Sequence, residues 1–450
     1  MKIIVCVKVI KGEINPFDAS ALECAMQMSD DVTVVSMGPK SSADALLPLT
    51  RLGVKAVLIS DSVFAGSDTL ATSYILSTAI KGMDYDLILC GRQSIDGDTA
   101  QVGPMLSQKL GIDLITNAMT VTTSAEEVTA ITRDGTQTAT LPALVTVERG
   151  YVLRFPSIFS KPGQVDVIDN SQLDCDTSLC GLSGSPTRVV KTFENERGRR
   201  KCKFITYDEL IPLAKKLAGE EREHAGKREV KEKLKCVWAV GDEVLEKASE
   251  IAETVIRLDK MPPDQIAERA MSEKPDVVLW NADLWGRKNA PVAAAILNTG
   301  LCADCTELEV EDGVFYMYRP AQGGNITAKI KCLTKPQMAT VRTKTDSSQI
   351  IVSGGKGVAD KKDKLAELAK TLDAELGASR GLVDMNAAEY ELQIGLTGKT
   401  VSPRVYIAIG ISGAVHHTCA IEGADTVIAV NPDKDARICE YADYGIIAEF

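Results

Sequence analysis

The sequence predicts an α/β protein with two related domains on doubly wound parallel sheets, followed by a flavodoxin-like or Rossmann-like domain. Three observations support this fold. Short apolar runs rich in β-branched residues alternate with helical patterns over residues 1–150, which is the order of a parallel sheet with crossover helices. The same order returns in the second half of the chain. The last hundred residues then place glycine-rich loops after four further apolar runs.

Length and composition describe a multidomain globular protein. A chain of 450 residues is too long for one hydrophobic core. The formal net charge of -11 argues against nucleic acid or an anionic membrane as the main partner. No apolar run approaches the ~20 residues that a membrane helix needs, and the N-terminal segment MKIIVCVKVI lacks the features of a signal peptide. We therefore expect a soluble, cytoplasmic protein.

Twelve cysteines are scattered along the chain, several within apolar runs. Free cysteine is an ordinary small apolar residue in such places, so we expect reduced thiols. The spacing of Cys302 and Cys305 is typical of a zinc or redox site. A second pair with this spacing is missing from the sequence, and we therefore expect no metal site.

The first 150 residues alternate regularly between strand and helix patterns. A doubly wound sheet is built in this order. The expected strands are residues 3–9, 32–38, 56–60, 86–91 and 139–147, and the expected helices include residues 21–28, a segment ending near 52, and 70–80.

A second copy of this pattern follows at a nearly constant spacing. The segment DYDLILCG at 84–91 is matched by KPDVVLWN at 274–281, and LPALVTVE at 141–148 is matched by KPQMATVR at 335–342. Asp86 and Asp276 are 190 positions apart, and Pro142 and Pro336 are 194 apart. Any two parallel-sheet domains share such runs, so coincidence remains the alternative. We interpret the match as two similar α/β domains.

Residues 174–233 differ in character from the domains on either side. They are turn-rich at first and then charge-dense, and FITYDELIPLAKKLAG at 204–219 predicts one amphipathic helix. The basic cluster at residues 197–203 is compatible with a nucleic-acid patch. Its flanking glutamates and the acidic total favour a solvated connecting arm instead.

Four strand-to-loop units in the last hundred residues are arranged as in a nucleotide-binding domain. They are IIVSGGKG (350–357), LGASRGLVD (376–384), QIGLTGKT (393–400) and VYIAIGISGAVHH (405–417). Loops that follow buried parallel strands lie at the carboxyl edge of the sheet, where open α/β sheets bind nucleotides.

Several segments along the chain resemble the two subunits of electron transfer flavoproteins. INPFDASALECA (14–25) and LILCGRQSIDGDTAQVGP (87–104) resemble the β subunit; RPAQGGNITAKI (319–330) resembles the first domain of the α subunit, and residues 351–450 resemble its FAD domain. The resemblance covers nearly the whole chain and implies a fused form. It implies a β-like domain at 1–173, an arm at 174–233, an α-like domain at 234–349 and an FAD-binding domain at 350–450.

The resemblance implies which residues hold FAD. Arg380 matches an arginine beside the flavin ring, where a fixed positive charge favours the reduced, anionic flavin. His417 matches a histidine that hydrogen-bonds the pyrimidine end of the ring. The other implied FAD contacts are Ser379, Gln393, Thr397, Gly398, Ser412, Gly413, Asn431 and Glu449.

A second adenine nucleotide is expected in the first domain. The segment DGDTAQVGP at 96–104 follows a buried strand and opens a helix, so its amide groups can bind a phosphate at the positive helix end. The resemblance implies AMP in simple members of the family or a second FAD in electron-bifurcating ones. The implied contacts are Asn15, Ser36, Asp96, Asp98, Thr99, Gln101 and Val102.

The sequence departs from the family pattern at several places. Leu396 replaces a glutamine near the flavin, and the lysine-rich segment that docks acyl-CoA dehydrogenases is replaced after Ser157 by IFSKPGQVDV. Docking of that type of dehydrogenase is therefore uncertain. The sequence of residues 180–190 resembles that of family members from anaerobes. Many of those members split the electron pair of NADH.

The expected function is electron carriage through FAD, from a flavin- or NADH-linked dehydrogenase to a redox acceptor. No catalytic residues are assigned, because no Ser/His/Asp set or paired carboxylate stands out. One alternative is a bifurcating flavoprotein with two FAD and NADH as reductant. Another is a nucleotide-binding scaffold or sensor without redox function. We also expect the FAD domain to swing on a hinge at residues 344–350.

Overall fold

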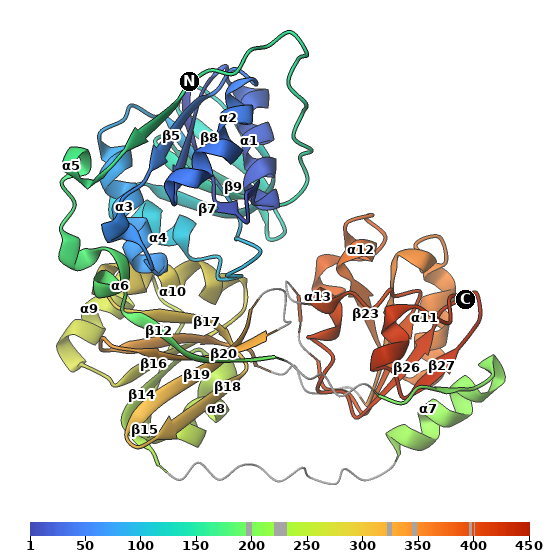
Figure 1. The fold of residues 1–450 in the computed structure, drawn as a ribbon. Coiled ribbons are helices and arrows are strands. Elements are labelled where there is room, and N and C mark those ends of the chain that lie inside the picture. Colours follow the sequence, from blue (N-terminus) through green and yellow to red (C-terminus); the bar gives the residue numbers. More distant parts are fainter. Residues whose placement is uncertain (195–199, 220–231, 322–325, 344–348, 396–397, 400) are drawn as a thin grey trace. The chain divides into compact units, whose positions relative to one another are not determined.

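The computed structural model describes residues 1–194, 200–219, 232–321, 326–343, 349–395, 398–399 and 401–450. These residues fold into two compact units (Figure 1). The first unit contains residues 1–192 and the described parts of 230–322 and 328–341; the second contains the described parts of 193–229, 323–327 and 342–450. Both units are built on parallel sheets with helices, which confirms the predicted α/β class.

The first domain is organised around a nine-stranded sheet. Seven strands are parallel, and β8 and β9 continue the edge as antiparallel strands. The sheet order is β11 (Val165–Ile168), β5 (Lys55–Ile59), β4 (Asp31–Met37), β1 (Lys2–Cys6), β6 (Leu87–Gly91), β10 (Ala143–Val147), β7 (Asp113–Thr123), β8 (Glu127–Thr132) and β9 (Gly135–Thr140).

Local sequence signals explain where the helices of this domain begin and end. Asp68 caps α3 by accepting hydrogen bonds from the N–H groups of Leu70 and Ala71 at 3.0 and 3.1 Å. Gly111 ends α4 with φ of +69°, a conformation that glycine adopts without strain. The helices are α1 (Pro16–Met28), α2 (Ala43–Thr50), α3 (Thr69–Lys81), α4 (Val102–Leu110) and the short α5 (Asn170–Leu173) and α6 (Gly181–Gly184).

The first strand is shorter than the sequence predicts. It ends at Cys6 instead of Val9, because Val9 and Ile10 turn into a small hairpin of β2 (Val9–Ile10) and β3 (Glu13–Ile14). This hairpin brings the chain to the start of α1, beside the carboxyl end of β1.

The second domain contains a parallel sheet and a four-stranded sheet. The parallel sheet has the order β15 (Ala252–Leu258), β14 (Leu234–Val240), β16 (Val277–Asn281), β21 (Gln337–Val341) and β17 (Leu301–Cys305). The four-stranded sheet has the order β12 (Thr187–Glu194), β20 (Ile326–Cys332), β19 (Val314–Ala321) and β18 (Glu307–Glu311). The helices are α8 (Leu245–Ile251), α9 (Pro263–Glu273) and α10 (Leu284–Leu297).

The two parallel sheets repeat one topology, as the sequence spacing predicts. In the first, β4, β1, β6, β10 and β7 are neighbours; in the second, β15, β14, β16, β21 and β17 follow in the same order. The helices α4 and α10 correspond, since each follows the equivalent strand. Leu70 and Met105 of the first domain join one hydrophobic cluster with Ala290 and Ala294 of α10, so the two copies share apolar packing.

The second unit is built on one parallel sheet. Its order is β13 (Lys203–Phe204), β27 (Tyr444–Ile446), β26 (Thr426–Val430), β25 (Val405–Ile409), β22 (Ile350–Gly354), β23 (Glu375–Ser379) and β24 (Gln393–Ile394). The series β23, β22, β25, β26, β27 is the 2-1-3-4-5 order of flavodoxin-like folds. The helices are α7 (Leu210–Ala218), α11 (Lys362–Leu372), α12 (Arg380–Val383) and α13 (Val415–Thr418).

Part of the connecting arm belongs to this second unit. β13 pairs in parallel with β27, and the α7 residues Leu210 and Ala214 are buried in the core beside Val352 and Ile428. The predicted amphipathic helix therefore packs on the last domain with its apolar face. Of the basic cluster, residues 197–199 lie outside the described part of the chain, and Arg200 forms an ion pair with Asp443.

The predicted hinge at 344–350 falls largely on residues 344–348, which lie outside the described residues. Among the helices that the structure describes, none is both long and apolar enough to span a membrane.

Candidate functional site

A cavity of about 320 Å³ opens at the carboxyl edge of the first parallel sheet. It lies between the loops that follow β1 and β6, where the strand order of the sheet reverses. Nucleotides bind at such switch points in open α/β sheets, and the volume is at the lower end of the roughly 300–1,000 Å³ of small-molecule sites. The cavity is therefore suited to a ligand the size of a mononucleotide.

Two predicted residues have buried polar atoms without a partner among the described residues, and one of them, Asn15, lines the cavity. The Asn15 amide lines the cavity and is 1 % exposed; its Nδ2 donates to the carbonyl of Gln93 at 2.9 Å. Its Oδ1 and the hydroxyl of Ser36 are buried and have no hydrogen-bond partner among the described residues. Val35 and Met37, the neighbours of Ser36 on β4, line the cavity, whereas Ser36 itself is not among its lining residues. An unpaired buried acceptor is costly unless a ligand or water satisfies it.

The loop from 92 to 101 is held in shape by side chains of its own and by residues outside it. Asp96 forms an ion pair of 2.7 Å with Lys8, and Asp98 Oδ1 accepts a hydrogen bond of 3.0 Å from Gln93. Asp98 has φ of +52°, which aspartate tolerates better than most residues. The two predicted aspartates thus position the loop, while Thr99 lines the cavity.

The amino end of α4 is open toward the cavity. Gln101 is the residue before this helix, and no side chain caps α4 in the described structure. Val102 and Gly103 line the cavity, so the first N–H groups of the helix remain available to an anion. The Gln101 side chain is used differently: its Oε1 accepts from Thr69 Oγ1 at 2.7 Å, and its Nε2 donates to the carbonyl of Leu301 at 3.1 Å. It ties the loop to the second domain.

The cavity also contains residues that the sequence did not single out. Asp18 accepts hydrogen bonds from the N–H groups of Lys8 (2.7 Å) and Gly91 (3.1 Å), and burial raises the pKa of its carboxyl to about 7 despite these bonds. Arg92 is paired with Glu148 at 2.7 Å in a buried ion pair. A polar residue directly after a predicted strand was the signal available for Arg92, whereas Lys8 lies within the strand predicted at 3–9. The missed lining residues that carry polar side chains include Lys8, Asp18, Asp68, Thr69, Arg92 and Gln93.

In the second unit, the predicted FAD residues gather along one edge of the sheet. Ser379 ends β23 and Arg380 follows it, Gln393 begins β24, Ser412 and Gly413 follow β25, Asn431 follows β26, and Glu449 follows β27. All these strands are parallel, so their carboxyl ends meet at the same edge. The strand order reverses between β22 and β25, and this edge has the position of a ligand site.

Arg380 supplies a positive charge at this edge. Its guanidinium is part-exposed and lies 3.2 Å from Asp384, one turn further along the chain. Ser379 caps the short helix α12 by accepting from the N–H of Leu382 at 3.3 Å. The cap fixes the backbone at the point where the arginine begins, so that the side chain can reach an anionic ligand.

His417 is held between two protein groups. Its Nδ1 lies 3.0 Å from the carbonyl of Ile394, which can only accept, so Nδ1 carries the hydrogen. Nε2 then accepts from the hydroxyl of Tyr406 at 2.9 Å. Burial lowers the pKa of His417 to about 4, which keeps the ring neutral. Tyr406 is a residue of this site that sequence reasoning missed, because it lies within a buried strand.

The remaining predicted FAD residues differ in exposure. Gln393 is fully buried, whereas Ser412 and Glu449 are exposed. The N–H of Gly398 donates to the carbonyl of Gly395 at 3.0 Å. Thr397 and the neighbouring Leu396 lie outside the described residues.

Two positions show how closely the loops at this edge approach one another. Gly413 has φ of +83°, and a Cβ there would lie 2.2 Å from the backbone nitrogen of Ile438, so any other residue would push the loops apart. Asn431 Nδ2 donates to the carbonyl of Ile411 at 3.1 Å. The edge thus combines the Arg380 cation, the hydroxyl groups of Ser379 and Ser412, and loops that approach one another closely.

The CxxC spacing has a structural explanation. Cys302 and Cys305 lie in β17 and are buried in the hydrophobic core of the second domain. Burial raises the pKa of the Cys305 thiol well above its ordinary value, so both residues act as small apolar groups there.

Two domain families match this chain. The electron transfer flavoprotein domain matches residues 3–172 and 262–374, and thus falls on both copies of the repeat. The electron transfer flavoprotein FAD-binding domain matches residues 344–422.

Three individual relatives each match about two fifths of this chain. The electron transfer flavoprotein subunit alpha of Thermoanaerobacterium thermosaccharolyticum is 38% identical over 231 residues, which are 41% of this chain and 70% of that subunit. Protein FixB of Clostridium saccharobutylicum is 38% identical over 231 residues, 41% of this chain and 69% of that protein. The electron transfer flavoprotein subunit beta of Megasphaera elsdenii is 39% identical over 201 residues, 40% of this chain and 74% of that subunit.

Proposed function

Because this chain belongs to the electron transfer flavoprotein family, with β-like and α-like parts in one polypeptide, we propose that it carries electrons through FAD bound at the carboxyl edge of its last sheet. Proteins of this family act with dehydrogenases and redox acceptors. The observation that carries the proposal is the alignment of Arg380, Ser412 and Asn431 at the ends of neighbouring parallel strands. The FAD domain is assigned to residues 350–450.

When bound, FAD supplies the redox chemistry, and the protein supplies orientation and charge. The Arg380 guanidinium favours the negatively charged form of the ring, because a nearby cation stabilises an anion in a partly desolvated site. Asp384 holds that guanidinium in place at 3.2 Å. His417 has its hydrogen on Nδ1, toward Ile394. Nε2 could therefore donate to the ring only after gaining a proton, and it would then give up the bond that it accepts from Tyr406.

The first domain, assigned to residues 1–173, is proposed to hold AMP. Three features support AMP: the cavity of about 320 Å³, the unpaired acceptor of Asn15 and the open end of α4. These features suit one base and one phosphate, whereas a second FAD needs space for a flavin as well. A second FAD with NADH as reductant, as in the bifurcating members that the sequence resembles at 180–190, is the alternative outcome of the test.

A docking surface for the electron donor is proposed on the segment after Arg149. The side chains of Val152, Phe155, Ile158 and Phe159 are between 84 and 96 % exposed. Exposed apolar side chains of this size mark interaction sites when they cluster. The later part of this segment, from Ile158 on, stands where the family has its lysine-rich docking sequence, so the partner proposed here is a dehydrogenase with an apolar contact surface instead of an acidic one.

One measurement tests the proposed function. The purified full-length protein is denatured, and the FAD and AMP released per chain are counted. One FAD and one AMP are expected for an electron carrier. Two FAD without AMP would replace simple carriage by the bifurcating alternative. A colourless protein that cannot be reconstituted with FAD would replace it by a non-redox scaffold.

A further inference from the structure

The second α/β domain repeats the fold of the first, yet its equivalent edge is built differently. We infer that this edge is a nucleotide-type site closed from within: the first turn of α10 fills the place of the ligand, and a network around Lys260 and Asp283 holds that turn there. The inference rests on the proposed nucleotide site of the first domain. It assigns Lys260, Asp283 and Trp280 as the residues that restrict this unit to one nucleotide.

The strand residues at the two edges differ in bulk. In the first domain Cys6 and Cys90 are direct neighbours on β1 and β6, and both line the cavity. The equivalent strands β14 and β16 pair Val240 with Trp280. An indole thus stands where the first domain has a thiol. Trp280 is fully buried, so its ring occupies volume that a cysteine leaves free.

The connection after the strand is also shorter in the second domain. Residues 92–101 separate β6 from α4, whereas only Ala282 and Asp283 separate β16 from α10. Helix α10 consequently starts directly at the strand end. A Cβ on Gly286 would lie 1.9 Å from the carbonyl oxygen of Asn281, so only glycine permits this approach. The loop that would surround a phosphate has been replaced by helix.

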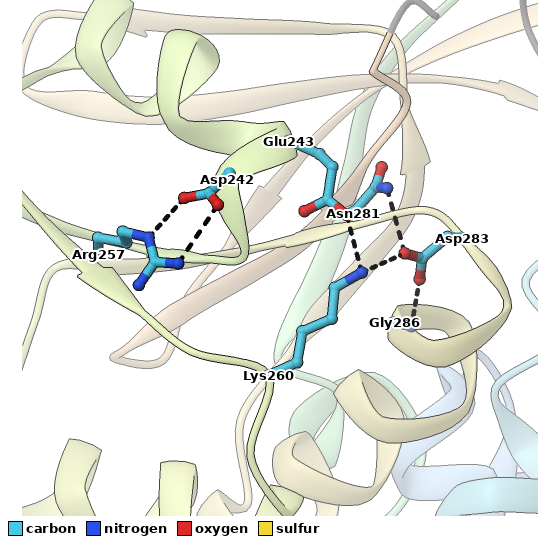
Figure 2. A network of polar contacts seen from close by, with 7 residues as sticks. All are labelled: Asp242, Glu243, Arg257, Lys260, Asn281, Asp283 and Gly286. Carbon is cyan, nitrogen blue, oxygen red and sulfur yellow. Dashed lines mark hydrogen bonds and ion pairs between the residues drawn. The ribbon is translucent and has the colours of Figure 1, made fainter.

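A polar network fixes this first turn (Figure 2). Asp283 Oδ1 accepts from the N–H of Gly286 at 2.7 Å, while Oδ2 lies 2.8 Å from Lys260 Nζ and 3.2 Å from Asn281 Nδ2. Lys260 Nζ also contacts Glu243 at 2.8 Å. The helix end that is uncapped in α4 is therefore capped in α10 by a carboxylate with its own counter-ion.

Aromatic packing completes the closure. Trp285, in the first turn of α10, stacks on Trp280 with ring centroids 5.4 Å apart and an angle of 27°. Lys260 Nζ lies 5.8 Å from the centroid of the Trp285 ring, within the range of a cation–π contact. The same lysine therefore contacts both the cap and the ring that fill the edge.

The experiment compares Lys260→Met with Arg257→Gln in the full-length holoprotein. Arg257 is a matched control, because it lies at the same edge and pairs with Asp242 and Asp259 without an ion pair to Asp283 in the described structure. Amide hydrogen exchange is measured by mass spectrometry on the peptide spanning 281–290. Exchange at the first turn of α10 is expected to rise roughly threefold in Lys260→Met and to stay unchanged in Arg257→Gln.

Nucleotide counting supplies the second readout. Apart from the FAD of the last domain, one adenine nucleotide per chain is expected, and Asn15→Ala should lower its occupancy. A second adenine nucleotide per chain beyond that FAD would show that the second edge is open and would overturn the inference. Equal exchange in the two charge variants would overturn the role of Lys260. Absence of any nucleotide from the wild-type first domain would refute the proposed AMP site, whereas the exchange comparison would still decide whether the network holds α10.

Discussion

His417 Nε2 lies 2.9 Å from the hydroxyl of Tyr406, and its Nδ1 lies 3.0 Å from the carbonyl of Ile394. The imidazole therefore links β25 to the end of β24 inside the last domain. Both ring nitrogens are used while the ring is neutral, so protonation of Nε2 must reverse the bond to Tyr406, and any event that draws the ring toward a ligand must break one of these bonds.

The stability of the second unit should fall in mild acid because of His417. Its pKa is lowered to about 4 by burial, whereas an unfolded histidine titrates near 6.5. The unfolded chain therefore takes up the proton first, so the stabilising contribution is present above pH ~6.5 and is lost toward pH ~4. Urea unfolding between pH 4 and 7 should show a decrease of roughly 3 kcal/mol from this residue.

The neighbouring histidine provides the control for this effect. His417→Gln should flatten the pH dependence, while His416→Gln should retain it, since His416 is exposed. The same slope in both variants would assign the acid sensitivity to other groups.

Removal of the Arg380 charge should make bound FAD harder to reduce. Arg380→Gln is expected to lower the midpoint potential by roughly 50–100 mV, which is the effect of losing ~1–2 kcal/mol of charge stabilisation per electron. Spectroelectrochemical titration measures the potential. Lys370→Gln removes an exposed charge from the last turn of α11, at the far end of that helix from its start after β22, and should leave the potential unchanged. An unaltered potential in Arg380→Gln would show that this arginine does not lie beside the flavin ring.

Asn15 should contribute directly to AMP affinity. Its unpaired Oδ1 is a buried acceptor at the cavity, and loss of one such hydrogen bond costs ~1–2 kcal/mol. Asn15→Ala is therefore expected to weaken AMP binding about tenfold in isothermal titration calorimetry of nucleotide-free protein. Asn170→Ala is the control, because that amide bonds Cys175 instead. Equal affinity in both variants would contradict the placement of AMP.

The exposed aromatic residues after Arg154 should govern docking to the electron donor. Phe155 and Phe159 are 96 % and 87 % exposed, and aromatic anchors dominate many interfaces. The double substitution Phe155→Ser and Phe159→Ser should raise the apparent KM for the reducing dehydrogenase about tenfold, without changing the FAD potential. Ile131→Ser, at an exposed apolar position on β8, should have no effect. A raised apparent KM in both the double variant and Ile131→Ser would indicate general destabilisation.

Sequence reasoning predicted the fold well where the pattern was local. Buried runs such as residues 86–91 define strands, and the helical pattern at 70–80 defines α3, through contacts close in the chain. The repeat was visible because two sheets with the same topology need the same spacing of strands. The end of β1 was placed too far along, because the alternation in Val7, Lys8 and Val9 continues a strand pattern into the β2–β3 hairpin.

The candidate sites were predicted unevenly. Asn15 and Thr99 were recognised through a resemblance, and the structure places both at the cavity. Asp18 and Tyr406 were missed, because a helix residue and a strand residue acquire their role only when distant segments meet. For Gln101, a polar residue before a helix did not reveal that its amide would bond Thr69 and Leu301. The FAD-site assignments remain predictions.

The pairing of β13 with β27 has a consequence for the folding of this protein during translation. Lys203 meets Tyr444 in that pair, so a strand made early in translation must wait for one made near the end. At about 5–20 residues per second, the delay is roughly 12–48 s. During this interval the apolar face of α7, with Leu210 and Ala214, lacks its final partners and would depend on chaperones or transient contacts at the ribosome. Slowing translation before residue 444 should therefore increase aggregation of the nascent chain.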